Sequence, residues 1–116
     1  MSETFQILIA DDHPLVRGAL KQALSTELDN VTLYEAGSLF EAIEQIEAHK
    51  GDIDLVLLDL HMPGMNGFTG LFTLRASYPD IPVSIVSASQ DMPVVRRSIE
   101  YGASAFVPKS APVDQI

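Results

Sequence analysis

The chain has 116 residues, of which 47% are hydrophobic and 20% are charged, and it contains no cysteine. This length suits one domain that buries roughly two-thirds of the surface of its unfolded chain. The composition excludes collagen, coiled coil and general disorder. Without cysteine, disulfide scaffolds, thiolate nucleophiles, iron–sulfur clusters and zinc–thiolate sites are excluded as well.

The charge balance is acidic: seven Lys and Arg oppose sixteen Asp and Glu, which gives a formal net charge of −9. Because the phosphates of nucleic acid repel such a surface, we expect this domain itself to make no DNA contact. The sequence has no run of about 18 apolar residues and no basic segment at its start. It therefore predicts neither a membrane span nor a signal peptide, and we interpret the protein as cytoplasmic.

The first half of the chain predicts two strands, over 6–10 and 31–36, each followed by a helix. The first strand lacks polar alternation, which is typical of a strand covered on both faces of a parallel sheet. Pro14 suits the first turn of the helix that follows. The second helix is predicted to begin after Ser38, because Glu41 lies three residues later and completes a capping box.

The same alternation continues through the second half of the chain. It predicts strands over 54–59, 81–87 and 105–107, with a helix from 68 towards 78 and another that ends at Gly102. Strict alternation indicates parallel βαβ units, and so an α/β fold with a doubly wound, five-stranded parallel sheet. Only seven residues follow Lys109, too few for a helix that covers the last strand. We therefore expect the fifth helix to be truncated or missing, and residues 1–116 to be one domain cut from a longer chain.

Carboxylates stand where two of the predicted strands end. Asp11 and Asp12 follow the first strand, and Asp59 closes the third. In open parallel sheets, ligands bind at the carboxyl ends of the strands, and the flavodoxin-like order 2-1-3-4-5 would make these two strands neighbours. Two carboxylates about 5 Å apart repel by roughly 3 kcal/mol at an effective dielectric near 20. Such a cluster needs a counter-charge, and Mg²⁺, which binds oxygen ligands and keeps waters for a phosphoryl group, would supply it.

Two further residues are predicted to reach the same crevice. Lys109 follows the fifth strand and would add a positive charge, whereas Ser87 closes the fourth strand and would offer a hydroxyl donor. Taken together, these strand-end residues indicate a functional site in which the carboxylates are balanced by a cation, a lysine and a hydroxyl donor.

The order of these motifs resembles the receiver domain of bacterial two-component response regulators. The resemblance lies in Asp11-Asp12, in the segment Leu-Asp-Leu-His-Met-Pro-Gly around Asp59, in Ser87-Ala88, and in Lys109 after Ala-Phe-Val-Pro. It covers essentially the whole chain from residue 7 to 109. The opening segment, residues 7–20, further resembles regulators of the LuxR/NarL type, which carry a C-terminal helix-turn-helix DNA-binding domain after the receiver.

The resemblance implies a role for each matching residue. Asp59 would accept the phosphoryl group, and Lys109 and Ser87 would contact it. Mg²⁺ would be held by Asp12 directly, by Asp11 through a water, by Asp59, and by the backbone carbonyl of His61. Ser87 and Phe106 would act as the switch, with Phe106 turning inward behind Ser87 and altering the face formed by the fourth helix and fifth strand.

The resemblance also implies partners. The phosphoryl donor would be a sensor histidine kinase or a phosphotransfer protein, and the output would be transcriptional control. DNA would be reached only through an output domain beyond this sequence, phosphorylation would favour a homodimer, and no membrane partner is expected. The domain would be a regulatory phosphoacceptor and not a turnover enzyme, although it assists its own phosphorylation and dephosphorylation.

Two positions depart from the family pattern or stand out in it. Phe106 lacks the hydroxyl of the commoner Tyr, which puts in doubt any output that needs that hydrogen bond. His61 stands two residues past Asp59, where its side chain could overhang the phosphoryl group. We expect His61 to affect how fast water attacks the acyl phosphate.

Each residue also has an ordinary structural explanation. Asp11 or Asp59 could be a helix cap or turn former, Lys109 a surface lysine, Ser87 a partner of a strand-end backbone group, and Phe106 core filler. A metal site that includes His13 is disfavoured, because imidazole prefers softer metals and three consecutive side chains rarely converge.

Three other functions compete with the receiver hypothesis. An aspartyl-phosphate hydrolase usually has a second Asp two residues beyond its nucleophile, where this chain has His61. A flavin-binding module would need a phosphate-binding loop after the first strand, where Asp11 and Asp12 would repel phosphate. A degenerate receiver that only dimerises is disfavoured because every functional position is occupied.

Overall fold

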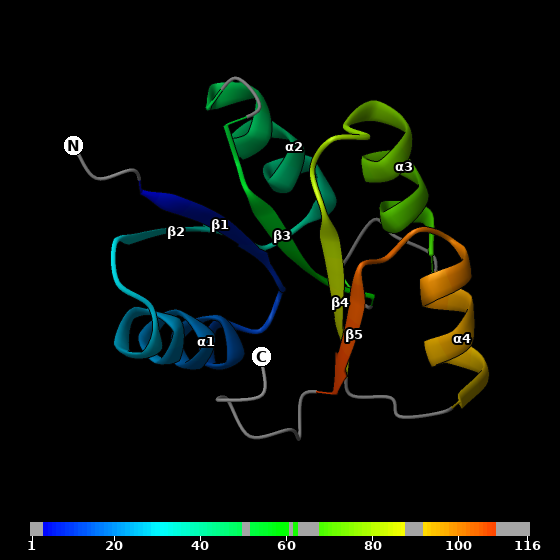
Figure 1. Cartoon of the computed structure of the whole chain (residues 1–116), viewed down its shortest axis with the longest axis horizontal. Helices are drawn as coiled ribbons and strands as arrows, with labels where there is room; N and C mark the ends of the chain where they lie inside the picture. Colours follow the sequence, from blue (N-terminus) through cyan, green and yellow to red (C-terminus); the bar gives the residue numbers. More distant parts are fainter. Residues whose placement is uncertain (1–3, 50–51, 61, 63–67, 88–91, 109–116) are drawn as a thin grey trace.

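The computed structural model describes residues 4–49, 52–60, 62, 68–87 and 92–108. In these residues five strands alternate with four helices along the chain (Figure 1). The strands are β1 (Phe5–Ala10), β2 (Val31–Ala36), β3 (Leu55–Asp59), β4 (Val83–Ser87) and β5 (Ala105–Pro108). The helices are α1 (Pro14–Glu27), α2 (Leu39–Ala48), α3 (Thr69–Ser77) and α4 (Met92–Glu100). The predicted alternation of strands and helices is confirmed.

The five strands form one parallel sheet in the order β2-β1-β3-β4-β5, which confirms the predicted doubly wound topology. Ala10, the last residue of β1, pairs with the last residue of β2 on one side and with Leu58 of β3 on the other. Asp59 pairs with Val86 on β4, and Ser87 with the last residue of β5. The residues that follow β1 and β3 therefore leave the sheet side by side at its carboxyl edge.

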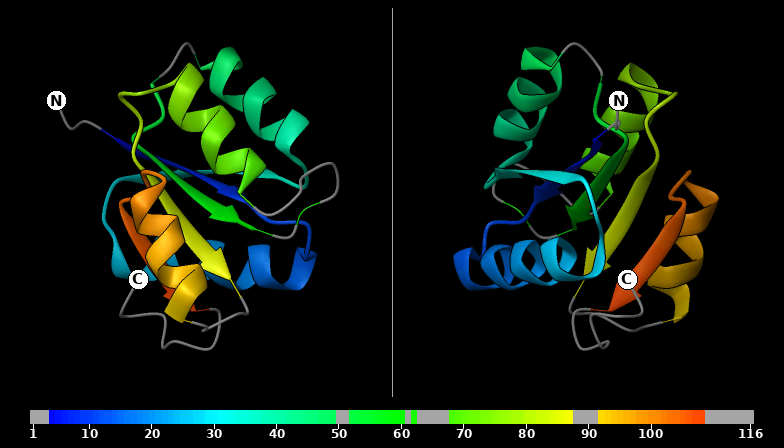
Figure 2. Two further views of the ribbon diagram at one scale, coloured as in Figure 1. Left: turned by 90° about the vertical axis from the view of Figure 1, so that its right-hand side faces the viewer. Right: turned by 60° about the vertical axis from the view of Figure 1, so that its left-hand side comes forward.

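Hydrophobic side chains of the strands fill two separate cores, one on each face of the sheet. Figure 2 shows α2 and α3 on one face and α1 on the other. On β1, Leu8 and Ala10 belong to the core that α2 and α3 cover, whereas Ile7 and Ile9 belong to the core under α1. All four are at most 1% exposed. Burial on both faces explains why this strand shows no polar alternation in sequence.

The starts of α1 and α2 follow the local signals in the sequence. Pro14 opens α1, as expected. At α2, the hydroxyl of Ser38 accepts a hydrogen bond from the backbone N–H of Glu41 at 3.1 Å. The Glu41 carboxylate accepts in return from the backbone N–H of Gly37, at 2.9 Å. The reciprocal bond thus reaches one residue further back than in the usual capping box, in which it ends on the N-cap residue.

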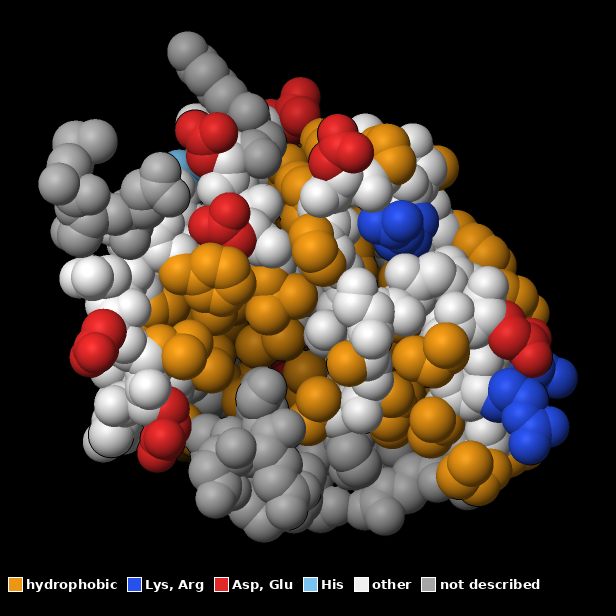
Figure 3. Space-filling view, in the orientation of Figure 1, with side chains coloured by type: hydrophobic (Ala, Val, Ile, Leu, Met, Phe, Trp, Pro, Cys, Tyr) orange, Lys and Arg blue, Asp and Glu red, His pale blue; other side chains and the backbone are white. Residues whose placement is uncertain are grey.

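On the α1 face, an apolar groove of about 430 Å³ runs between α1 and the last strands of the sheet. Figure 3 shows hydrophobic side chains around this hollow. Its floor includes Leu57 and Val107, and Leu24 and Leu28 form part of its wall. This is the face that the expected fifth helix would cover, but the residues after Pro108 lie outside the described part of the chain. Among the described residues, no helix is long and apolar enough to cross a membrane.

One charged group of β2 ties α1 to the sheet. The carboxylate of Glu35 accepts hydrogen bonds from Arg17 Nε and Lys21 Nζ, both at 3.2 Å. Partial burial of Glu35 acts to raise its pKa, but the hydrogen bonds and positive charges of Lys21 and Arg17 outweigh burial and hold the pKa below its usual value. A carboxyl whose folded-state pKa is lowered stabilises the fold above its unfolded pKa, and this contribution disappears as the pH falls through the folded pKa.

We expect Glu35→Gln to lower the free energy of unfolding by about 0.5–1 kcal/mol at pH 7, as is usual for a partly exposed ion pair. The deficit should shrink as the pH falls below the ordinary glutamate value of 4.5, because the wild-type carboxyl then also loses its charge. Urea unfolding of wild type and Glu35→Gln between pH 7 and pH 3 measures this. Glu44→Gln on the exposed side of α2 is the matched control, and a deficit independent of pH would contradict the prediction.

Candidate functional site

Asp11 and Asp12 lie directly after β1, at the carboxyl edge of the sheet. The backbone N–H of Asp11 still donates to the carbonyl of Ala36 at 2.9 Å, so the chain leaves the sheet only after this residue. Asp11 is 1% exposed, whereas the side chain of Asp12 is 27% exposed. Both carboxylates therefore lie at the carboxyl edge of the sheet, where Asp11 is buried and Asp12 is nearer to solvent.

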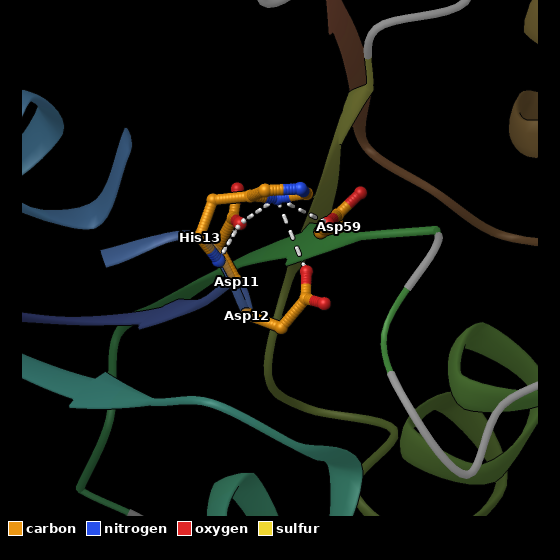
Figure 4. A group of neighbouring side chains, drawn as sticks. All are labelled: Asp11, Asp12, His13 and Asp59. Carbon is orange, nitrogen blue, oxygen red and sulfur yellow. Dashed lines mark hydrogen bonds and ion pairs between the residues drawn. The ribbon is translucent and has the colours of Figure 1, made fainter. Parts of the chain in front are cut away.

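Asp59, the last residue of β3, faces these two residues from the neighbouring strand, and it is 1% exposed. Each of Asp11, Asp12 and Asp59 offers a carboxylate oxygen, and these oxygens lie within 4.8 Å of one another (Figure 4). Residues far apart in the sequence thus meet in one cluster, as the predicted strand order requires. We refer to these three side chains as the acidic cluster.

His13 joins the acidic cluster, contrary to expectation. Its Nδ1 lies 3.0 Å from Asp11 Oδ1, 3.1 Å from Asp12 Oδ1 and 3.8 Å from Asp59 Oδ2 (Figure 4). Its backbone N–H also donates to Asp11 Oδ1, at 2.8 Å. The expectation that three consecutive side chains would not converge is wrong here, because the chain turns back at His13 as it enters α1. The backbone bond to Asp11 holds that turn.

Arg17, in the first turn of α1, is a second residue of the site that no sequence motif had indicated. Its Nη1 donates to the backbone carbonyl of Asp11 at 2.7 Å, while its Nε contacts Glu35 on β2. A Cβ on residue 37 would lie 3.2 Å from Nη1, so Gly37 leaves room for the guanidinium. Arg17 therefore fixes the position of the loop that carries Asp11 and Asp12. The available signal was weak: an arginine one helical turn after His13.

The structure also places the two predicted switch residues. Ser87 closes β4 next to β3 and is fully buried. Phe106 lies on β5, where it pairs with Ile85 of β4 and packs, partly buried, against the core on the α2 and α3 side. Ser87 is thus at the same edge as the acidic cluster, and Phe106 lies one strand further along. Lys109 and His61, the other two predicted site residues, lie outside the described residues.

The chemistry of this cluster suits a hard divalent cation. All three carboxylates offer oxygen ligands, and magnesium sites typically use one or two carboxylates and keep several waters. Asp12 Oδ1 is buried and accepts no hydrogen bond from the described residues, although His13 Nδ1 lies 3.1 Å away. A buried carboxylate oxygen without a donor is costly unless a cation balances it. The donor set therefore fits Mg²⁺.

Comparison with known proteins identifies the family. Residues 7–116 match the family model described as the response regulator receiver domain. A glycerol metabolism activator from Pseudomonas putida is 46% identical over 112 residues, which cover 97% of this chain and 50% of that protein. The chain spans about half the length of the first curated relatives that it matches.

Solved structures agree with this assignment. The signal receiver domain of a NarL response regulator from Mycobacterium tuberculosis superposes with a TM-score of 0.85 at 32% identity, covering 97% of this chain and 90% of that chain. The Borrelia burgdorferi CheX–CheY–BeF3–Mg²⁺ complex gives a TM-score of 0.84 at 29% identity, covering 96% and 82%.

The chain therefore belongs to the response regulator receiver family. Within it, the similarity is to receivers of the NarL/LuxR type, as the opening segment of the sequence indicated. Receiver domains are regulatory modules of two-component systems, they interact with histidine kinases or other phosphodonors, and they generally bind Mg²⁺ at an acidic pocket.

Removing one charge from the acidic cluster should stabilise the cation-free protein. We expect Asp12→Asn to raise the free energy of unfolding in EDTA by about 1 kcal/mol, because it relieves part of the repulsion among carboxylates while keeping the shape of the side chain. The same variant should lose most of the stabilisation that millimolar Mg²⁺ gives the wild type. Thermal and urea unfolding with and without Mg²⁺ measure both effects.

Asp80→Asn, in the loop before β4 at the opposite edge of the sheet, is the matched control and should change neither quantity. If Asp12→Asn destabilised the EDTA-treated protein, the carboxylates would not be repelling one another as proposed.

Proposed function

We propose that this domain is a phosphorylation-activated signalling switch that accepts a phosphoryl group on Asp59 from a sensor histidine kinase or a phosphotransfer protein. One observation carries the proposal: Asp59 meets Asp11 and Asp12 at the carboxyl edge, although β1 and β3 are far apart in sequence. Mutual repulsion of the three carboxylates destabilises the fold, so such a cluster indicates a functional site. Membership of the receiver family supports the same function.

We propose Mg²⁺ as the cofactor of the acidic cluster. Asp12 and Asp59 would be direct ligands, Asp11 would act through a bound water, and the backbone carbonyl of His61 would be the remaining protein ligand. The related CheY complex from Borrelia burgdorferi includes Mg²⁺, which supports this choice. When bound, Mg²⁺ would supply positive charge that offsets both the carboxylates and the oxygens of an incoming phosphoryl group.

The chemical step that we propose uses Asp59 as a nucleophile. An oxygen of its ionised carboxylate forms a bond to phosphorus while the phosphorus–nitrogen bond of the donor phosphohistidine breaks, and the electron pair leaves with the donor imidazole. No proton needs to be taken from Asp59. The protein therefore contributes by positioning the reacting groups and by neutralising the negative charge of the phosphoryl oxygens. Arg17 contributes by holding the loop of Asp11 and Asp12 against the carboxyl end of β1.

Ser87 and Lys109 are proposed to contact the phosphoryl oxygens once Asp59 is modified. Ser87 supports this role by its place at the end of β4, the strand beside β3. Lys109 follows β5, the next strand in the sheet, and would contribute its positive charge. A phosphoryl group adds negative charge and strong acceptor oxygens at one point, to which both side chains would donate.

The signal is proposed to pass from Ser87 to Phe106. Movement of Ser87 towards the phosphoryl group would vacate space on the α4 side of β4, and the ring of Phe106 would turn into it. Phe106 is only partly buried, so its ring can become more buried. A difference of about 3 kcal/mol between two states changes their ratio more than a hundredfold. The face formed by α4 and β5 would then differ between the two forms.

The output is proposed to be transcriptional, through a DNA-binding domain that follows the receiver. Two observations support this: relatives about twice as long as this chain, and the similarity to NarL. With a net charge of −9, the receiver itself is a poor partner for DNA. We propose that its phosphorylated form dimerises, and that it is a regulatory phosphoacceptor and not a turnover enzyme.

Incubation with acetyl phosphate and Mg²⁺ should add one phosphate to the wild type, a mass gain of about 80 Da. Asp59→Ala should show no gain, because the nucleophilic carboxylate is gone, and Asp54→Ala near the start of β3 should behave as the wild type. Intact mass spectrometry measures this directly. An Asp59→Ala protein that still gains a phosphate would contradict the assignment.

His61→Ala should change the lifetime of the phosphorylated protein by several-fold, because a side chain two residues past Asp59 can influence the access of water to the acyl phosphate. Loss of the added mass over time, after removal of acetyl phosphate, gives the rate. His49→Ala at the end of α2 is the control and should match the wild type. Equal rates in wild type and His61→Ala would reject the role of His61.

A further inference from the structure

The imidazole of His13 occupies the centre of the acidic cluster. Its Nδ1 lies within 4 Å of a carboxylate oxygen from each of Asp11, Asp12 and Asp59, at 3.0, 3.1 and 3.8 Å. An ionised carboxylate only accepts hydrogen bonds, so the nitrogen in contact with Asp11 carries its hydrogen. That N–H donates to Asp11 Oδ1, and Figure 4 shows the same nitrogen within reach of all three carboxylates.

We propose that His13 is an internal substitute for the divalent cation, in contact with the acidic cluster when the cation is absent and displaced when it binds. The inference rests on the proposed function of the cluster as a Mg²⁺ site and goes beyond it, because it assigns a competitor to that site. His13 would thereby regulate how readily the domain becomes competent for phosphorylation.

Competition follows from the distances. A Mg²⁺ ion lies about 2.1 Å from each ligand oxygen, and two of the oxygens that His13 contacts, on Asp12 and Asp59, belong to proposed direct ligands. The ring of His13 and the cation would both need the space between these oxygens. One of the two must leave, and the side chain of His13 can do so.

Two features allow the ring to move while the backbone around it stays in place. Its side chain is 56% exposed, so it can turn into solvent about its own χ angles. The backbone of His13 is held separately, by the bond from its N–H to Asp11 Oδ1 and by its carbonyl, which accepts from the N–H of Arg17 at 2.9 Å. Its side chain makes no capping bond to α1, so the start of that helix does not depend on the ring.

Displacement has a thermodynamic consequence. In the cation-free protein, His13 offsets part of the carboxylate repulsion, so it stabilises the state that binds no Mg²⁺. A group that stabilises the free state and is displaced on binding weakens the apparent affinity by the value of its contacts, which for one hydrogen bond of typical net strength corresponds to about 3- to 10-fold. His13 therefore sets a threshold of Mg²⁺ concentration for loading the site.

The test is Mg²⁺ binding to the intact chain by isothermal titration calorimetry at one fixed pH, without any phosphodonor. His13→Ala and His13→Ser should bind Mg²⁺ about 3- to 10-fold more tightly than the wild type. The serine variant also places a good N-cap residue before α1, so it keeps the test interpretable if the alanine variant folds poorly. His49→Ala, at the other histidine of the described chain, should bind as the wild type does.

Thermal unfolding supplies a second readout. The rise in melting temperature on adding saturating Mg²⁺ should be larger in His13→Ser than in the wild type, because only the wild type gives up contacts to admit the cation. Comparing the Mg²⁺-induced rise in melting temperature between the two proteins cancels any general effect of serine on the stability of α1. It should be absent in His49→Ala.

The outcomes separate the two proposals. Equal Mg²⁺ affinity in wild type and His13→Ser overturns the role of His13 and leaves the acidic cluster as a Mg²⁺ site. Weaker binding in both His13 variants also overturns it, because His13 would then support the cation. If neither the wild type nor His13→Ser binds Mg²⁺, the proposed cofactor fails and this inference fails with it. Binding by His13→Ser alone supports the inference in its strongest form.

Discussion

Repulsion among three carboxylates is the constraint on which the rest of this structure depends. Asp11 and Asp59 are almost wholly buried, and with Asp12 they bring oxygens within 4.8 Å of one another. Burial of like charges is tolerated only where hydrogen-bond donors or cations offset it. The sheet order imposes the cluster, because β1 and β3 are neighbours that end at the same edge. The site is thus a direct consequence of the topology.

Two basic side chains, those of Arg17 and His13, contact the acidic cluster or the loop that carries it. Arg17 holds the loop after β1 from the α1 side through the carbonyl of Asp11, and the same side chain reaches Glu35 on β2. The ring of His13 contacts all three carboxylates, and its side chain is 56% exposed. The contact of Arg17 with the Asp11 carbonyl therefore fixes the loop, while a ligand can displace the contact of His13 with the carboxylates. This division lets the fold stay intact while the charge at the site changes.

Much of the fold could be predicted because its signals are local. Buried strands appear as unbroken apolar runs, and Pro14 and Ser38 mark the helix starts where the structure has them. The ends of the strands were predicted less closely. The strand expected from residue 81 begins at Val83, and before it the carbonyl of Pro82 already accepts a hydrogen bond from the backbone N–H of Val56. The convergence of Asp59 with Asp11 and Asp12 could also be predicted, since it follows from the strand order alone.

The sequence by itself determined the parallel sheet and the carboxylates at the ends of its strands, because hydrophobic pattern and strand ends are encoded residue by residue; the strand order was expected from the flavodoxin-like fold, and the structure has it. Only the tertiary structure decided that the ring of His13 turns into the acidic cluster and that Arg17 reaches the carbonyl of Asp11. Neither contact has a sequence signal of its own. Each depends on the direction of a side chain and on where the neighbouring strand places its partner, and those are properties of the packed chain.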